Sequence, residues 1–387
     1  MKSVELKKDI YWVGAVDWDI RNFHGYLTQR GSSYNSYLIM DEKIVLVDSV
    51  KHYLYEEMLE RIKQIVDPSK IDYIICNHVE MDHSGSIPKI IKLCPNVIIV
   101  TSPQGEKGLK MHYDTTNWNF HIVKSGDTIN IGTRNIAFLQ TPMVHWPDNM
   151  VSYISEEKII FSNDAFGQHI ASTGRFDDEV PYSMLVEEAR KYYANIVLPY
   201  GSQVQKVMEE VKKLDIEIIA TSHGIIWRNY IADIVRLYDK WSRNETEKKA
   251  VIVYDTMWES TKKMANAIKD AFEDKDYNIH MYNLQGTHIS DVMTELITAE
   301  YICIGSPTLN SSILPTVAAF LAYMKGLAPK NRKAIAFGSY GWAPLSIKEI
   351  EETLTKAGMD VVASEKINFV PTEVQLKELT DRIKKVI

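Results

Sequence analysis

Cysteine is scarce in this sequence. The 387 residues include three cysteines, Cys76, Cys94 and Cys303, which lie far apart, each in or beside an apolar run. Their spacing does not suggest a disulfide framework, and without a Cys-x-x-Cys pair the chain has no thiolate iron site of its own. We therefore expect three reduced core cysteines and a cytoplasmic protein.

Long apolar runs and clustered basic residues are also missing. No apolar run approaches the roughly 20 residues that span a bilayer, and the first residues, Met1–Glu5, lack an apolar signal region. The net charge is −7, and no stripe of Lys and Arg stands out. We expect neither a membrane nor a nucleic-acid partner.

What remains has the composition of an ordinary globular protein, with 45% apolar and 25% charged residues. A chain of 387 residues is too long for one typical core, so two domains are expected. The composition turns polar between Trp241 and Lys249, and a new apolar strand begins at Ala250. We place the domain boundary there, with a first domain of residues 1–247 and a second of residues 248–387.

The first half combines short strands with amphipathic helices. The apolar runs Tyr37–Met40 and Ile44–Val47 flank a turn and predict a hairpin. Residues Leu54–Val66 show helical periodicity, and Ile71–Ile75 predicts a buried strand. Such strands, interrupted by helices, indicate an α+β domain in which two sheets are sandwiched between helices.

The second half alternates strands and helices. Five strand–helix units follow one another in about 140 residues, from the strand Ala250–Tyr254 to a C-terminal helix through Glu373. This alternation predicts an α/β domain with a doubly wound five-stranded parallel sheet and helices on both faces. Ligands of such sheets bind beyond the carboxyl ends of the strands.

The stretch Cys76–Gly85 concentrates side chains of the kind that bind metals. It contains His78, Glu80, Asp82 and His83, directly after an apolar run. Carboxylates brought together at a strand end repel one another, and each buried one needs its own partner. A divalent metal ion removes both problems, so the stretch predicts a metal site; the alternative is an exposed polar loop.

Three further residues of this kind are His145, Asp164 and His223. Each follows an apolar strand and precedes a small residue, a proline or a turn. A single histidine is more often a core or surface residue than a ligand, but these three share the position at which a sheet presents functional side chains. We expect them to join the metal site.

The order His-x-Glu-x-Asp-His, followed by His, Asp and His, resembles the metallo-β-lactamase fold, an αββα sandwich with a two-metal site along one edge. Zinc-binding members usually have a second histidine where this chain has Glu80. A carboxylate in place of an imidazole shifts the preference toward iron or manganese. Together with Met143–Asp148 and Ser162–Gly167, the pattern is similar to the flavodiiron proteins over nearly the whole chain.

This resemblance implies a non-haem diiron site. One iron would be held by His78, Glu80 and His145, the other by Asp82, His83 and His223, with Asp164 as the bridge. Two ferrous ions carry about +4 and the three carboxylates about −3, so a bridging hydroxide makes the site neutral and less costly to bury. Each iron keeps an open position for a diatomic ligand.

His24 and His169 match positions that line the pocket in relatives. From the residues alone, two interpretations of each are equally good: a hydrogen-bonded core histidine, or a residue that faces the substrate.

Three loops of the second half resemble the FMN loops of flavodoxin. The first is rich in hydroxyls and opens a helix, so it can hold a phosphate or act only as a helix cap. The other two supply small residues for close approach and aromatic rings for the isoalloxazine. Flavodoxins commonly have glycine where this chain has Glu259. The expected FMN-binding residues are Thr256, Met257, Trp258, Glu259, Ser260, Thr261, Ser306, Pro307, Thr308, Leu309, Asn310, Ser339, Tyr340, Gly341 and Trp342.

The resemblance implies an oxidoreductase that reduces O2 to water, NO to N2O, or both, at two irons that receive electrons through FMN. It also implies rubredoxin or a similar small carrier as the donor, with a reduced deazaflavin coenzyme as the alternative. In a head-to-tail homodimer, or a dimer of dimers, the flavin of one subunit would meet the irons of the other. Two other interpretations stay open: a zinc hydrolase of the metallo-β-lactamase type, and an FMN electron carrier with an inactive first domain.

Overall fold

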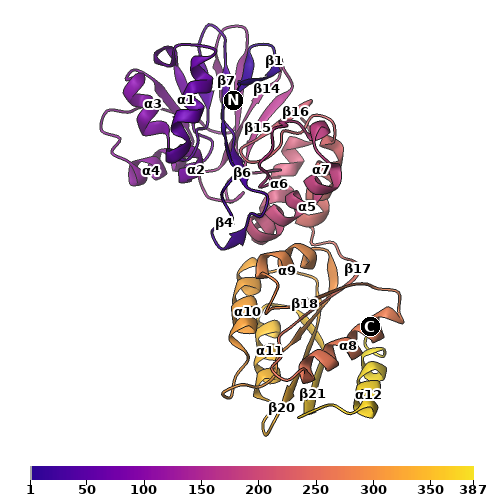
Figure 1. The fold of residues 1–387 in the computed structure, drawn as a ribbon. Coiled ribbons are helices and arrows are strands. Elements are labelled where there is room, and N and C mark those ends of the chain that lie inside the picture. The colour runs from indigo at the N-terminus through magenta and orange to yellow at the C-terminus, as the bar shows by residue number, and fades with distance from the viewer. Residues whose placement is uncertain (1) are drawn as a thin grey trace. The chain divides into compact units, whose positions relative to one another are not determined.

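The computed structural model describes residues 2–387, which form two compact units (Figure 1). The first unit comprises the chain up to Tyr192 together with Ser202–Asp239, and the second comprises Tyr193–Gly201 and Lys240–Ile387. The boundary expected between residues 247 and 248 falls at the start of strand β17 (Glu247–Tyr254) and stays a prediction.

Two large sheets form the centre of the first unit. One has seven strands in the order β1-β2-β7-β8-β9-β10-β11, and the other has five in the order β12-β13-β14-β15-β16; β3 pairs with β6 and β4 with β5. The predicted hairpin is confirmed, because β7 and β8 are antiparallel neighbours. The bounds are β1 Val4–Lys7, β2 Ile10–Trp12, β3 Ala15–Asp17, β4 Asn22–Phe23, β5 Tyr26–Leu27, β6 Ser32–Tyr34, β7 Tyr37–Ile39, β8 Val45–Val47, β9 Tyr73–Ile75, β10 Ile98–Thr101, β11 Asn119–Ile122, β12 Thr128–Asn130, β13 Asn135–Gln140, β14 Met150–Ile154, β15 Ile159–Asn163 and β16 Ile218–Thr221.

Alternating side chains of the first sheet enter two separate cores. In β8, Val45 and Val47 pack with Phe138 and Phe161 of the second sheet, so this core lies between the sheets. Leu46, one residue along, packs instead with buried residues of the helices on the opposite face. Every strand residue of β8 is buried, which explains why its sequence is an unbroken apolar run.

Helices cover the outer faces of both sheets. Helices α1 (Tyr55–Lys63), α3 (Ile87–Leu93) and α4 (Pro103–His112) lie against the first sheet, and α5 (Tyr182–Tyr192), α6 (Gly201–Val211) and α7 (Ile231–Ser242) lie beside the second (Figure 1). The short helix α2 (Met81–Ser84) starts inside the predicted metal-binding stretch. This arrangement is the predicted αββα sandwich.

The second unit is the predicted five-stranded parallel sheet. Its order is β18-β17-β19-β20-β21, and all four pairings are parallel. Helices α8 and α12 pack on one face, and α9, α10 and α11 lie on the other (Figure 1). The bounds are β17 Glu247–Tyr254, α8 Ser260–Glu273, β18 Asn278–Asn283, α9 Ile289–Leu296, β19 Ala299–Gly305, α10 Pro315–Leu327, β20 Lys333–Tyr340, α11 Leu345–Lys356, β21 Asp360–Asn368 and α12 Glu373–Ile383.

Strand β21 is longer than the sequence suggests. Only Val361–Val362 stands out as apolar, yet the strand extends to Asn368. It lies at the edge of the sheet, and Ser364 and Lys366 alternate outward into solvent, so the apolar run is interrupted. Across residues 2–387, the helices include none with the length and apolar character to cross a membrane.

Candidate metal centre and flavin pocket

The seven side chains expected at the metal site meet in the first unit, where several strands end. His78 and Glu80 follow β9, Asp82 and His83 lie in α2, and His145 lies between β13 and β14. Asp164 and His223 follow the neighbouring strands β15 and β16. Because the ends of β9, β15 and β16 lie together, residues up to about 145 positions apart reach one site.

These side chains form two groups. His78, Glu80, His145 and Asp164 offer ligand atoms that all lie within 4.8 Å of one another. Asp82, His83 and His223 form the second group by the same measure. The two groups have the same members as the two ligand sets expected from the resemblance, and their assignment as metal ligands stays a prediction.

The Asp164 carboxylate joins the two groups. Its Oδ2 lies 3.2 Å from His145 Nε2 and 3.6 Å from His78 Nε2. Its Oδ1 lies 3.1 Å from His83 Nε2 and 3.2 Å from His223 Nε2. Each oxygen therefore faces one pair of imidazoles.

The other two carboxylates each serve one pair. Glu80 Oε2 lies 3.4 Å from His78 Nε2 and 3.5 Å from His145 Nε2. Asp82 places Oδ1 3.4 Å from His83 Nε2 and Oδ2 3.3 Å from His223 Nε2. Each group thus has two imidazoles, one carboxylate of its own and one oxygen of Asp164.

The polar atoms at the centre of this arrangement fit metal ions. His78 Nε2, His83 Nε2 and both carboxylate oxygens of Asp82 and of Asp164 are buried, and none has a hydrogen-bond partner within residues 2–387. Buried polar atoms without partners are costly, and several at one place need an explanation. A metal ion in each group would coordinate all of them, and mixed nitrogen and oxygen donors suit iron.

Partners on the far side of two imidazoles fix their orientation. His78 Nδ1 lies 2.8 Å from Asp148 Oδ2, which also accepts a 2.8 Å hydrogen bond from the Val79 amide. His223 Nδ1 lies 3.0 Å from the carbonyl oxygen of Ser33. Since a carbonyl only accepts, Nδ1 of His223 carries a proton, and Nε2 is the ring atom that remains to bind a metal. No separate sequence pattern marks Asp148, which lies at the end of the segment Met143–Asp148.

The electrostatics of the cluster favour cations. Burial lowers the pKa of His145 and of His223, but the neighbouring carboxylates outweigh it and raise the pKa values to about 9 and about 10. Despite burial, the surrounding imidazoles hold the pKa of Asp164 well below its usual value. Without metal, the carboxylates therefore retain protons on the imidazoles as counter-charges.

His24 and His169 occupy different environments. His24 is largely exposed, and its Nε2 lies 2.8 Å from Glu80 Oε1. His169 is fully buried, with Nδ1 2.7 Å from Ser32 Oγ and its ring centroid 5.0 Å from that of His223. Burial holds the pKa of His169 well below its usual value. His24 is thus no core histidine, whereas His169 packs behind the cluster.

A cavity of about 710 Å³ opens onto the cluster. Its lining includes His24, Glu80, Asp82 and His145, together with apolar side chains such as Phe23. Lys51, His52 and His112 also line it, and the sequence provided no pattern that marks them.

A second cavity, of about 510 Å³, lies in the second unit at the ends of β17, β19 and β20. Of the predicted FMN residues, it is lined by Met257, Trp258, Ser260, Pro307, Thr308, Leu309, Asn310, Ser339, Tyr340, Gly341 and Trp342. Ser311, Ala343, Leu345, Phe369 and Val370 complete the lining and were not anticipated. Phe369 and Val370 were missed because they follow the part of β21 that the apolar pattern did not reveal.

The remaining predicted residues lie around this lining. Thr261 Oγ1 is 3.1 Å from Ser339 Oγ, Ser306 Oγ accepts a hydrogen bond from the Leu314 amide, and Thr256 is buried. Glu259 has φ of +65°, the left-handed conformation that favours glycine. Its side chain points to solvent and pairs with Lys262 at 2.9 Å, so its charge is directed away from the pocket.

Comparison with known proteins extends over both units. Residues 33–224 match the family described as ODP family beta lactamase, and residues 252–382 match flavodoxin. A nitric oxide reductase of Moorella thermoacetica is 43% identical over 94% of this chain and 92% of its own length.

Solved structures agree over almost the whole length. The rubredoxin oxygen:oxidoreductase of Desulfovibrio gigas superposes with a TM-score of 0.96 at 39% identity, covering 99% of this chain and 97% of that one. The flavodiiron protein of Giardia intestinalis gives a TM-score of 0.97 at 34% identity, covering 100% and 96%. With a β-lactamase-like unit followed by a flavodoxin unit, and relatives of this identity and coverage, the chain belongs to the flavodiiron family of oxidoreductases.

Proposed function

We propose that this protein reduces O2, NO or both at a pair of iron ions held by its first unit, with electrons supplied through FMN in its second unit. The observation that carries the proposal is the position of Asp164, whose two oxygens each face a different pair of imidazoles. The names of the relatives, a nitric oxide reductase and a rubredoxin oxygen:oxidoreductase, support both substrates.

His78, Glu80 and His145 would hold one iron, and Asp82, His83 and His223 the other, with Asp164 shared. Such ions act as Lewis acids and one-electron donors toward a bound diatomic molecule. The open side of the cluster faces the cavity, so a small substrate can enter while Phe23 and Trp146 limit water.

The position of His24 suits proton transfer between solvent and the cavity. Its Nε2 hydrogen bond to Glu80 Oε1 raises its pKa, and the ring lies at the cavity wall while remaining open to solvent. Reduction of O2 to water and of NO to N2O both consume protons. His169, neutral and buried against His223, would instead keep that imidazole in place.

The flavin would bind in the cavity of the second unit. The N-terminus of α8 and the hydroxyls of the Thr256–Thr261 loop suit the phosphate, and the rings of Trp258, Tyr340 and Trp342 suit the isoalloxazine. Reduced FMN supplies two electrons and two ferrous ions supply one each. Four electrons reduce one O2 to two waters, and two electrons convert two NO to N2O and water.

The electron donor would be rubredoxin or a similar small carrier, with a reduced deazaflavin coenzyme as the alternative. The rubredoxin oxygen:oxidoreductase relative supports the first. We also propose a head-to-tail homodimer, alone or paired into a dimer of dimers, in which the FMN of one subunit serves the irons of the other.

The direct test is anaerobic purification, quantitation of iron and flavin, and measurement of O2 and NO uptake with reduced rubredoxin. We expect about two irons and one FMN per chain and uptake of at least one gas. Zinc without iron in a colourless protein would instead favour the hydrolase, and bound flavin without gas uptake would favour the electron carrier.

The dimer has its own test. An Asp164→Asn subunit and a subunit that cannot bind FMN are each expected to be inactive alone. In a mixed head-to-tail dimer, the intact flavin of the first would face the intact irons of the second, so mixing restores activity. Absence of recovery in verified mixed dimers would contradict this arrangement.

A further inference from the structure

A pair of stacked aromatic rings lies next to the helix that carries His83. The Tyr113 hydroxyl lies 2.9 Å from Ser84 Oγ, and Ser84 directly follows His83 in α2. Ser84 Oγ donates a 2.7 Å hydrogen bond to the Val79 carbonyl, so the Tyr113 O–H donates to Ser84. Tyr113 is thereby tied to the metal-binding stretch by a short hydrogen-bonded link.

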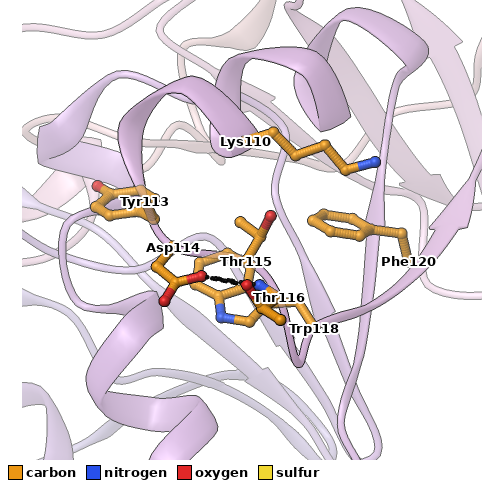
Figure 2. Close-up of a pocket in the computed structure, with 7 residues that line it drawn as sticks. All are labelled: Lys110, Tyr113, Asp114, Thr115, Thr116, Trp118 and Phe120. Carbon is orange, nitrogen blue, oxygen red and sulfur yellow. Dashed lines mark hydrogen bonds between the residues drawn. The ribbon is translucent and has the colours of Figure 1, made fainter.

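Trp118 stacks on the Tyr113 ring, and Phe120 lies next to Trp118. The ring centroids of Tyr113 and Trp118 lie 5.8 Å apart, with an interplanar angle of 23°. Those of Trp118 and Phe120 lie 6.1 Å apart, with an interplanar angle of 33°. All three rings line an open pocket of about 510 Å³ on the surface of the first unit (Figure 2). The Asp114 carboxylate, held by a 2.6 Å hydrogen bond from Thr116 Oγ1, and the Lys110 side chain line the same pocket.

Tyrosine and tryptophan are the side chains whose rings most readily lose a single electron. We propose that Tyr113 and Trp118 form an escape route for oxidising equivalents. When the flavin supplies too few electrons, an oxidising equivalent that remains at the metal centre moves through these two rings to the protein surface. This inference rests on the proposed reduction of O2. The route protects the metal ligands rather than taking part in turnover.

The electrons and protons balance as follows. Trp118 gives one electron to the metal centre through the Tyr113 ring, and its indole N–H proton passes to water in the open pocket. A thiol from solution then returns one hydrogen atom to Trp118, and two of the resulting thiyl radicals couple to a disulfide. Trp118 is restored, and the metal centre has gained one electron.

The one-electron oxidation ends on Trp118 and not on Tyr113. A tyrosine ring loses an electron readily only when its phenolic proton can leave, and Ser84 Oγ is a very weak base. Burial also raises the pKa of Tyr113. Tyr113 therefore serves as the bridge between α2 and Trp118.

The test is to give the iron- and FMN-loaded protein repeated pulses of O2 with too little reduced rubredoxin and no thiol, and to map oxidised tryptophan by peptide mass spectrometry. Trp18, in the same unit, is 46% exposed and serves as the internal reference for damage from solution. We expect oxygen to be added to Trp118 several-fold more than to Trp18, although Trp118 is the less exposed of the two. A thiol in the buffer should suppress the modification of Trp118.

Two variants isolate the route. Tyr113→Leu removes the bridging ring and should lower the oxidation of Trp118 several-fold. Tyr113→Phe keeps the ring, so most of the Trp118 oxidation should remain. The zinc-loaded protein, which has no redox chemistry, should oxidise neither tryptophan preferentially. Equal oxidation of Trp118 in the zinc-loaded protein or in Tyr113→Leu would overturn the proposal.

O2 uptake measured in the same samples separates the two hypotheses. If O2 is consumed but Trp118 is oxidised no more than Trp18, the escape route is wrong and the proposed function stands. If no O2 is consumed with iron and FMN bound, the proposed O2 reduction is wrong and the route falls with it.

Discussion

The two sites of this chain are built in opposite ways. Most of the proposed metal ligands are buried, with His78 at 0% and Asp164 at 2% exposure, and each lies close to others of the set. In the flavin pocket, Trp258 is 86% exposed and Trp342 94%. The buried set receives its geometry from the surrounding protein, whereas the open aromatic pocket becomes dry only when a ligand fills it. The metals should therefore be held by a rigid frame and the flavin by its own contacts, and changes at one site should spare the other.

Loss of the shared carboxylate is expected to have the largest effect. Asp164→Asn removes the negative charge and one coordinating oxygen from between four imidazoles, so at least one iron should be lost and gas uptake abolished. The flavin absorption spectrum should stay unchanged. Iron analysis and O2 and NO uptake measure the effect, and Asp114→Asn, a surface carboxylate of the same unit, is the matched control.

The second-largest effect should be the pH dependence of metal binding. In the metal-free protein the pKa values of His145 and His223 are about 9 and about 10, so both imidazoles carry protons at neutral pH. A metal must displace these protons, so its apparent affinity rises with pH, by about tenfold per unit for each proton released. Titration in weakly buffered solution between pH 6 and 8 should detect at least one proton released per chain. FMN binding should change far less over this range.

Removal of the partner of His78 should have an intermediate effect. Asp148→Ala frees His78 Nδ1 and the Val79 amide, and loss of such a partner typically weakens metal binding by about 10- to 100-fold. Asp148→Asn keeps an oxygen that can accept both hydrogen bonds and should lose less. If competition with a chelator shows equal affinity for Asp148→Ala and the unaltered protein, this partner does not position the ligand.

The flavin pocket should respond more weakly to truncation of one ring. Trp342→Ala removes one aromatic wall, worth about 0.5 to 1.5 kcal/mol, which weakens FMN binding by up to about tenfold. Fluorescence titration with FMN measures the change. Iron content should stay the same, and a loss of iron would contradict the independence of the two sites.

The smallest effect is expected at Glu259. A left-handed conformation costs a non-glycine residue about 1–2 kcal/mol, and the flexibility of glycine in the unfolded chain offsets about half of the gain. Glu259→Gly should therefore raise the stability of the second unit by about 1 kcal/mol or less. Thermal unfolding measures it, and Lys262→Ala, which breaks the same exposed ion pair without changing φ, should have little effect.

Local sequence patterns predicted more of the fold than of the candidate site. The alternation of strands and helices after residue 247 was sufficient for the sheet, because each unit is local in sequence. The convergence of Asp164 and His223 on His78 depends on the parallel pairing of β15 with β16, which periodicity does not encode, and it was reached through resemblance to a family. Asp148 and Phe369 were missed because their roles arise only from distant neighbours, the imidazole of His78 and the edge strand β21.

The different supports of His78 and His223 would make the two halves of the proposed metal centre electronically unequal. An anionic oxygen behind one imidazole makes that ring a stronger electron donor than an uncharged peptide oxygen makes the other. Although each half offers the same kinds of side chain, an ion bound beside His78 should be the harder of the two to reduce. Mössbauer spectra of the iron-loaded protein should then contain two resolved quadrupole doublets of equal area, one for each iron.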